Sequence, residues 1–376
     1  MAVTALLITT CYLVLPKPDK SVKPATPPWL GDDQLQQAVV GQTDKSDAPG
    51  IIFTLYKGDS KDPEIVLEIG HADHHESRAI SRNDHFRVAS LSKSFVGYIM
   101  LRLVDEGRVN LDATLADYLP DAPNADKVIL RDLGTNTSGV PNIARNQDFQ
   151  RAVEQNPEKY WSASELLAFT DTMPAEFDAG AKWSYSNTNT IYLAQVIEKI
   201  TGLKYGQALN RYVLEHLGLT HTDIDTVSGV PQPTPKGYRY GNTKYPFKYG
   251  GDWLELDHWN ASWAGASGNL YSNEQDIAVF THALLSGELL SKKQMGELFN
   301  WQKTTTKNLH YGFQVWDYFG ARVMMGDVHG FSAFSAYLPE YDRTLVVLAN
   351  LSNEKNKYSP AYLIGTHAIR EIYALN

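Results

Sequence analysis

The sequence contains a single cysteine, Cys11, among its 376 residues, so no internal disulfide can form. It has no long basic run, and its formal net charge of −9 argues against a nucleic-acid partner. Neither a G-x-x-x-x-G-K-[ST] loop nor a G-x-G-x-x-G turn after a strand occurs, so nothing supports a nucleotide site. What remains is an ordinary globular composition, 43% hydrophobic and 20% charged, long enough for one large domain or two lobes that share a cleft.

The chain also lacks an apolar run long enough to span a membrane. Residues 1–16 are apolar and uncharged, but a transmembrane helix needs about 20 such residues. They indicate the apolar core of a secretory signal or a short anchor. No Lys or Arg precedes them and no Ala-x-Ala site follows, so lipidation at Cys11 and a truncated or mis-called start are the alternatives. We expect residues 1–29 to be this segment plus a Pro- and Lys-rich linker, and the protein to be periplasmic or secreted; any membrane anchor would be residues 1–16.

Strand patterns occur near both ends of the chain and helical patterns lie between them. Two β-type runs separated by a polar turn predict a hairpin at residues 50–56 and 64–69. Further strands are predicted near the C-terminus, at residues 311–319, 321–325, 331–338 and 344–351.

Helices are predicted in three places besides a helix that starts near residue 90. One covers residues 190–200 and stops at Gly202. Another covers residues 272–285 and opens with Ser272 at capping-box spacing from Gln275. The last follows Ser359 and its proline and runs to residue 375.

This order of elements predicts an α+β fold, an α/β sandwich. One antiparallel sheet is built from both termini and flanked by helices, and a mainly helical lobe is inserted between its two halves. We expect one domain over residues 30–376, with a sheet lobe at about 30–88 and 308–376 and a helical lobe at about 109–300.

Ser90 and Lys93 head a strongly apolar stretch at residues 95–104. If that stretch is helical, residues three apart share a face, so the hydroxyl and the amine lie side by side. A serine is a poor nucleophile without a base, and a lysine is a base only when burial lowers its pKa from about 10.4. The same spacing recurs by chance at Ser352 and Lys355, in a charged segment, where we expect no catalysis.

Four segments carry a resemblance to a known family. They are FRVASLSKSF at residues 86–95, LGTNTSGVP at 133–141, GAKWSYSN at 180–187 and GASGNLYS at 265–272. Together they resemble the serine β-lactamase and penicillin-binding superfamily over roughly residues 30–375. The resemblance is greatest to class C β-lactamases, D-alanyl-D-alanine carboxypeptidases, D-aminopeptidases and their esterase relatives.

The resemblance implies a role for each site residue. Ser90 would attack a carbonyl and form an acyl-enzyme, while Lys93 and Tyr185 would move protons, and which of the two is the base stays open. Asn187 would donate its amide to the substrate and accept from Lys93. The alternative for Tyr185 and Asn187 is a tyrosine packed at a loop and an asparagine in a turn.

A third motif, MMGDVHGF at residues 324–331, departs from the family. Gly326 and the later glycine fit its frame, but Met324 stands where relatives carry Lys, His or Trp. A thioether cannot pair with a substrate carboxylate. His329 either takes over that role or is a turn residue. The oxyanion donors implied are the N–H groups of Ser90 and Asp327, and the Asp327 carboxylate must then point away.

The sequence therefore predicts a serine hydrolase that acts through an acyl-enzyme on amide or ester bonds of a small molecule or peptide. It would resemble a D-alanyl-D-alanine carboxypeptidase, a D-aminopeptidase or a β-lactamase; the alternatives are a carboxylesterase and a penicillin-binding sensor with little turnover. No cofactor or metal is expected, since the polar cluster at residues 71–76 is interpreted as a turn. Aromatic residues between 238 and 263 either line a cleft or pack the lobe, and the oligomeric state stays open.

Overall fold

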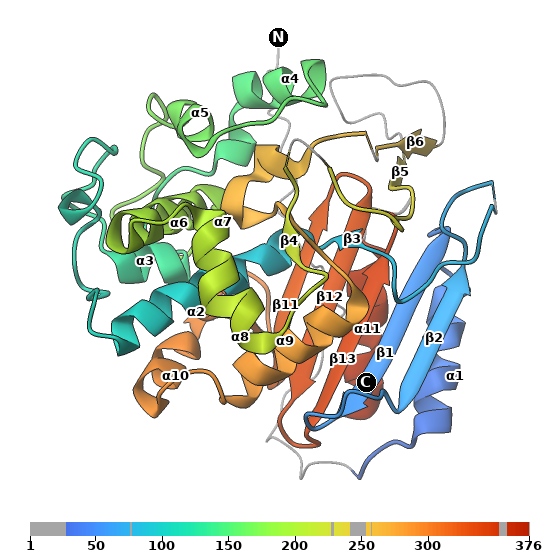
Figure 1. The fold of residues 1–376 in the computed structure, drawn as a ribbon. Helices are drawn as coiled ribbons and strands as arrows, with labels where there is room; N and C mark the ends of the chain where they lie inside the picture. The colour runs from blue at the N-terminus through green and yellow to red at the C-terminus, as the bar shows by residue number, and fades with distance from the viewer. Residues whose placement is uncertain are drawn as a thin grey trace.

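The computed structural model describes residues 28–75, 77–226, 229–240, 253–256, 258–352 and 359–375. Over these residues the main element is an eight-stranded antiparallel sheet in the order β2-β1-β13-β12-β11-β10-β9-β8 (Figure 1). The N-terminal hairpin joins the C-terminal strands, with Ile51 opposite Ala349. The predicted α+β fold with a sheet built from both ends of the chain is confirmed. The strands are β1 Gly50–Lys57, β2 Ile65–Gly70, β8 Gln302–Lys303, β9 Leu309–Tyr311, β10 Trp316–Tyr318, β11 Ala321–Val328, β12 Phe331–Leu338 and β13 Arg343–Ala349.

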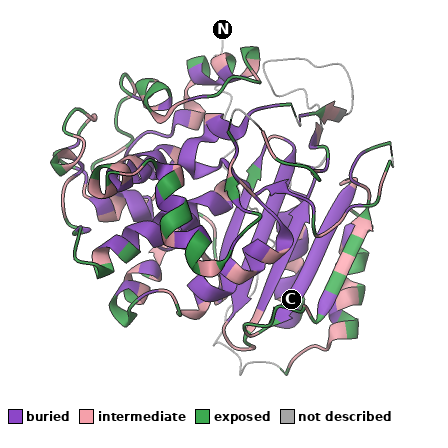
Figure 2. Ribbon diagram, in the orientation of Figure 1, coloured by how far each residue is buried: buried purple, intermediate pink, exposed green. Residues whose placement is uncertain are grey.

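Helices cover both faces of this sheet. Helices α1 (Asp32–Thr43) and α11 (Pro360–Ile372) pack on one face, and α9 (Glu274–Ser286) packs on the other (Figure 1). Side chains alternate between the two faces along a strand. In β13, Val347 therefore packs against α1 and α11, whereas Val346 packs on the face that α9 covers. The strand β12 is therefore buried along its whole length and β1 up to its last residue, whereas the edge strand β2, after its buried first residue, alternates between exposed and partly exposed positions (Figure 2).

The remaining helices form a body beside the sheet, which α2 (Ser92–Asp105) connects to it. Most of α2 is buried, including Phe95, which stacks on Phe280 of α9 at 3.7 Å between ring centroids. The other helices are α3 Leu130–Thr135, α4 Gln147–Gln155, α5 Ala163–Ala168, α6 Asn187–Thr201, α7 Tyr205–Leu209, α8 Glu215–Leu217 and α10 Lys292–Leu298. A small sheet joins β3 (Phe86–Arg87), β7 (Leu270–Ser272) and β4 (Asp223–Ile224), and β5 (Tyr238–Tyr240) pairs with β6 (Trp253–Glu255).

Two local predictions were wrong. The strand expected at 311–319 is split into β9 and β10 by a turn in which Gly312 N–H donates to Val315 O at 2.8 Å and Gln314 has a φ of 64°. The helix α9 is capped by Asn273, whose side chain accepts from Asp276 N–H at 2.9 Å, because Ser272 is already the last residue of β7.

The N-terminal expectations concern a different part of the chain. Residues 1–16 and most of the expected linker lie outside the described residues. Within the described ranges, no helix combines the length and apolarity that crossing a bilayer requires.

Candidate active site

Ser90 lies in a tight 3₁₀ turn, Ala89–Leu91, between β3 and α2. The turn is held from both sides by Ser92, whose hydroxyl donates to Ala89 O at 2.6 Å and accepts from Leu270 N–H at 3.2 Å. Ala89 itself has a φ of 52°, in the left-handed region that non-glycine residues seldom occupy. Such backbone geometry persists only where surrounding contacts enforce it, so the position of Ser90 is well determined.

Lys93 lies one helical turn after Ser90, as the spacing predicts. Its Nζ donates to Ser90 Oγ at 2.9 Å and to Ser267 O at 2.7 Å, and the residue is 2% exposed. Burial lowers the pKa of Lys93 well below its usual value, and the charge of Asp327 opposes this shift only in part. The amine is therefore shifted toward the neutral form that can accept a proton.

Tyr185 reaches the same oxygen from the loop before α6. Its hydroxyl donates to Ser90 Oγ at 3.0 Å. The backbone on either side is fixed by Asn142, whose side-chain amide donates to Tyr185 O at 3.2 Å and whose Oδ1 accepts from Asn187 N–H at 3.3 Å. The Ser90 oxygen thus has two hydrogen-bond partners, both of which can exchange protons.

The second partner of Lys93 differs from the one expected. The sequence predicted Asn187 as acceptor, whereas the structure places the Ser267 carbonyl there and Asn187 at the first position of α6. Ser267 lies in the segment at 265–272, which carried the resemblance but no assigned role. Gly265, at φ 53° and ψ −158°, has a backbone conformation that only glycine adopts readily, and it shapes the turn that presents this carbonyl.

Gly326 brings β11 against the nucleophile turn. A Cβ atom on Gly326 would lie 2.2 Å from Ser90 N and 2.9 Å from Ala89 Cβ, so only glycine permits this approach. The next residue, Asp327, projects from the other face of the strand, and its carboxylate accepts from Ser359 Oγ at 2.9 Å. The carboxylate thus points away from Ser90, as the implied oxyanion site requires, and Ser359 bonds to it instead of capping α11.

Comparison with known proteins decides the family. Residues 35–367 match the Beta-lactamase family. The chain belongs to the beta-lactamase family. As a member it is a hydrolase that acts on amide or ester bonds.

Among curated proteins, the chain is similar to a putative penicillin-binding protein PbpX of Bacillus subtilis. The two are 24% identical over 293 residues, which cover 77% of this chain and 68% of that protein. It is also 24% identical to the teichoic acid D-alanine hydrolase of Staphylococcus aureus over 64% of this chain and 53% of that protein. The chain therefore spans about half to two thirds of the length of these relatives.

Solved structures share the fold of this beta-lactamase-family protein. A D-amino acid amidase from Ochrobactrum anthropi superposes with a TM-score of 0.78 at 22% identity, covering 91% of this chain and 98% of that one. A D-stereospecific amidohydrolase from Streptomyces superposes with a TM-score of 0.75 at 24% identity, covering 90% and 97%.

Met324 is the point at which this beta-lactamase-family protein departs from the motif. It lies two residues before Gly326 and so on the same face of β11, it is 1% exposed, and it belongs to the apolar cluster between the sheet and α2. An apolar side chain therefore fills the position at which the resemblance implies a cation.

His329 does not restore the missing charge. It lies in the turn between β11 and β12, with its ring centroid 4.4 Å from that of Trp259 and 4.7 Å from that of Trp263. Burial, helped by the charges of Arg239 and Arg87, lowers the pKa of His329 to about 3. The imidazole is therefore neutral at pH 7, which makes it a poor partner for a carboxylate.

The other candidate sequence features have structural roles. Ser352 N–H donates to Tyr238 O at 3.0 Å, and Lys355 lies outside the described residues. The Asp73 carboxylate accepts from the N–H groups of His75 and Ser77 and closes a turn, and residue 76 is not described. Across the described ranges, no group of three or more His, Cys, Asp or Glu side chains is placed to hold a metal ion.

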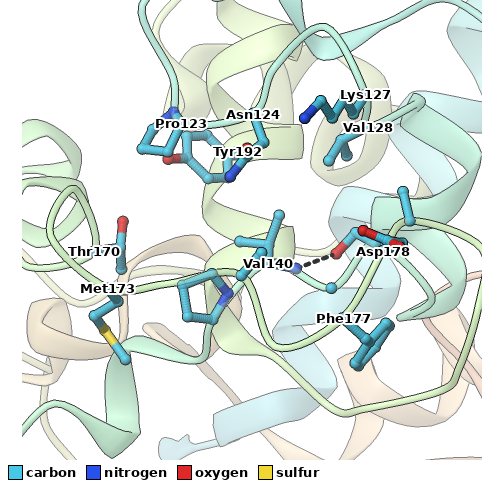
Figure 3. Close-up of a pocket in the computed structure, with 15 residues that line it drawn as sticks. Pro123, Asn124, Lys127, Val128, Val140, Thr170, Met173, Phe177, Asp178 and Tyr192 are labelled. Atoms are coloured by element: carbon cyan, nitrogen blue, oxygen red, sulfur yellow. Dashed lines mark hydrogen bonds between the residues drawn. The ribbon is translucent and has the colours of Figure 1, made fainter.

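A separate cavity of about 260 Å³ lies in the helical body, with Val140, Phe177 and Tyr192 among its lining residues (Figure 3). Its wall includes Ser138, whose hydroxyl accepts from Val140 N–H at 3.1 Å and donates to Asn189 Oδ1 at 2.7 Å. Ser90, Lys93 and Tyr185 do not line it, so it is distinct from the candidate active site.

Proposed function

We propose that the protein is a serine hydrolase that cleaves D-aminoacyl amides or esters, with Ser90 as nucleophile. The observation that carries the proposal is that Ser90 Oγ accepts two hydrogen bonds, from Lys93 Nζ at 2.9 Å and from the Tyr185 hydroxyl at 3.0 Å. Burial also lowers the pKa of Lys93. A hydroxyl that can lose its proton to one neighbour while the other remains ready to protonate a leaving group suits acyl transfer.

The chemistry follows in two half-reactions. Ser90 Oγ attacks the substrate carbonyl carbon while its proton passes to Lys93 or Tyr185. The resulting oxyanion is stabilised by the N–H groups of Ser90 and Asp327. Collapse breaks the bond to the amine or alcohol, which leaves with a proton delivered by the same pair of residues. A water molecule then attacks the acyl-enzyme, returns its proton through the same pair and releases the acid and free Ser90.

The substrate class is inferred from the chemistry of the third motif. Met324 and the neutral His329 offer no positive charge at the position where relatives place one, which disfavours substrates with a terminal carboxylate beside the scissile bond. Relatives are named as a D-amino acid amidase, a D-stereospecific amidohydrolase and a teichoic acid D-alanine hydrolase. Two of these names specify a D-amino acid or D-alanine and the third specifies D-stereochemistry, which supports D-aminoacyl amides and esters as the substrates.

The test combines two covalent probes with a substrate panel. We expect a fluorophosphonate to label the protein faster than a fluorescent penicillin, which carries a carboxylate. D-Alanine and D-phenylalanine p-nitroanilides and esters should be hydrolysed, with the L-enantiomers and D-Ala-D-Ala peptides turned over more slowly. Failure of both probes to label would refute the serine mechanism, and efficient cleavage of D-Ala-D-Ala would refute the substrate class.

The second candidate function is that of a penicillin-binding sensor. The observation that favours it is the similarity to a relative named as a putative penicillin-binding protein. It predicts stoichiometric labelling by penicillin with negligible turnover of every substrate in the panel.

A further inference from the structure

The hydroxyl of Tyr185 is held by its aromatic neighbours as well as by its hydrogen bond. The indole of Trp316 stacks on the Tyr185 ring, with centroids 5.9 Å apart and planes inclined by 20°. The ring of Tyr311 packs edge-on against two other rings. Its centroid lies 6.2 Å from that of Tyr185 and 4.5 Å from that of Trp316. Lys93 Nζ lies 5.0 Å from the centroid of the Tyr185 ring. The ring is therefore confined by the indole, a second tyrosine and the catalytic amine.

Trp316 comes from a different part of the molecule than the tyrosine it contacts. It lies on β10, paired with Val323 of β11 on one side and with Tyr311 of β9 on the other. The strand β11 is also the one whose Gly326 touches the turn around Ser90. Tyr185, by contrast, precedes α6 in the helical body. Trp316 thus connects Tyr185 to the sheet that fixes the nucleophile.

We propose that Trp316 is a positioning residue for the hydrolytic reaction, which sets the direction of the Tyr185 hydroxyl toward Ser90 by stacking on its ring. This inference rests on the proposed function, because it assumes that Tyr185 transfers protons. A tyrosine side chain rotates about two bonds, and the loop that carries it leaves the ring partly exposed. Without the indole, the ring gains orientations in which its hydroxyl no longer points at Ser90, and small misplacements of a proton-transfer group are costly in rate.

The test is a series of substitutions that separates stacking from packing. Trp316→Phe keeps a ring against Tyr185 and should retain most of the wild-type rate of labelling by fluorophosphonate. Trp316→Leu keeps an apolar side chain without a ring, and Trp316→Ala removes both. We expect both to lower the labelling rate and kcat by about tenfold or more, with KM changed less.

A double substitution distinguishes positioning from a general loss of structure. In a Tyr185→Phe background the hydroxyl is absent, so adding Trp316→Ala should lower the residual rate by less than about twofold, because residues that act through one another are not additive. Equal effects of Trp316→Ala in both backgrounds would overturn the proposal, as would full activity of Trp316→Leu.

Trp301 offers a matched control. Its ring stacks on that of Phe299, with centroids 5.3 Å apart, and within the described residues it makes no ring contact with Tyr185 or Trp316. Trp301→Ala should leave the labelling rate within about twofold of wild type.

A measurement without turnover completes the test. With 3-fluorotyrosine incorporated and the signal assigned by loss in Tyr185→Phe, the ¹⁹F resonance of residue 185 should shift and broaden in Trp316→Ala. An unchanged resonance would refute the stacking, whatever the activity. Absence of labelling in the wild type would instead refute the proposed function.

Discussion

At the scale of single residues, the sequence predicted the three side chains that meet at the site but not the groups that hold them in place. Ser90, Lys93 and Tyr185 meet at one oxygen, as their motifs indicate. The carbonyl of Ser267 and the amide of Asn142 complete the arrangement. A carbonyl acceptor leaves no signature in a sequence because every residue has one, so only the fold could reveal which carbonyl faces the lysine.

Ser90→Ala is expected to abolish covalent labelling by fluorophosphonate while leaving the unfolding midpoint nearly unchanged, because only one oxygen is lost. Intact-mass spectrometry of the probe adduct measures this. Ser352→Ala is the matched control, since that serine has the same spacing to a lysine in sequence but bonds to Tyr238 in the structure. A labelled Ser90→Ala protein would remove Ser90 from the mechanism.

Met324→Lys and Met324→His are expected to shift selectivity toward carboxylate substrates. A restored charged hydrogen bond is worth about 1.5–3 kcal/mol, or roughly ten- to a hundredfold in kcat/KM. The measurement is the ratio of kcat/KM for D-Ala-D-Ala to that for a D-alanine ester. The ratio is independent of how much protein is folded, which matters because Met324 is 1% exposed.

Met325→His provides the control for that ratio, because Met325 faces the α1 and α11 layer. An unchanged ratio in both Met324 variants would mean that Met324 only packs the core. High salt should reduce any gain, because an electrostatic contact is screened.

At the scale of elements, the long strands of the main sheet and the main helices were predicted from the sequence pattern, and the short strands β3 to β8 were not. α1 was not predicted because it buries few side chains, among them Leu35 and Val39. The split between β9 and β10 depends on Gln314 at φ 64°, where the side chain accepts from Thr190 Oγ1 and donates to the carbonyls of Leu133 and Gly134. Long-range bonds of this kind stabilise a turn that local propensity does not favour.

Gly326→Ala is expected to disrupt the contact between β11 and the nucleophile turn. The added methyl would lie 2.2 Å from Ser90 N, so the turn or the strand must shift. We expect a loss of stability of about 1–3 kcal/mol and a fall in labelling rate of about 10²-fold. Chemical denaturation and probe kinetics measure the two effects.

Gly296→Ala is the control for this change. Gly296 lies within α10, and a Cβ there meets no atom within 4 Å. That variant should be slightly stabilised, by up to about 1 kcal/mol, because alanine favours helix. Wild-type labelling by Gly326→Ala would show that the strand does not shape the site.

At the scale of the whole molecule, the active site reduces the stability of the fold that holds it. The sheet and its covering helices bury apolar side chains on both faces, but the interface where α2 meets them also buries the amine of Lys93. Burial favours the neutral amine, and in the unfolded chain the same amine has a pKa of about 10.4. In the unfolded chain the charged lysine is hydrated, and folding removes this favourable hydration. Burying Lys93 therefore lowers the free energy of unfolding at neutral pH.

Lys93→Met is expected to be inactive yet more stable than wild type by about 1–4 kcal/mol near pH 7, the range found when buried ion pairs are replaced by well-packed apolar residues. Because the folded pKa is lowered, the unfolded wild-type chain binds a proton that the folded chain does not, between the lowered pKa and about 10.4. Wild-type stability should therefore rise with pH across that window, and the stability advantage of Lys93→Met should shrink as the pH approaches about 10.4.

Denaturant unfolding of both proteins at several pH values measures the difference between their free energies of unfolding. The two proteins share all their other titratable groups, so the contributions of those groups cancel in this difference. Lys199→Met, at an exposed position of α6, is the control and should change the free energy of unfolding at neutral pH by no more than about 0.5 kcal/mol. If Lys93→Met were less stable than wild type at neutral pH, the lysine would be charged and well solvated in the folded protein. Tyr185, and not Lys93, would then be the base that accepts the Ser90 proton.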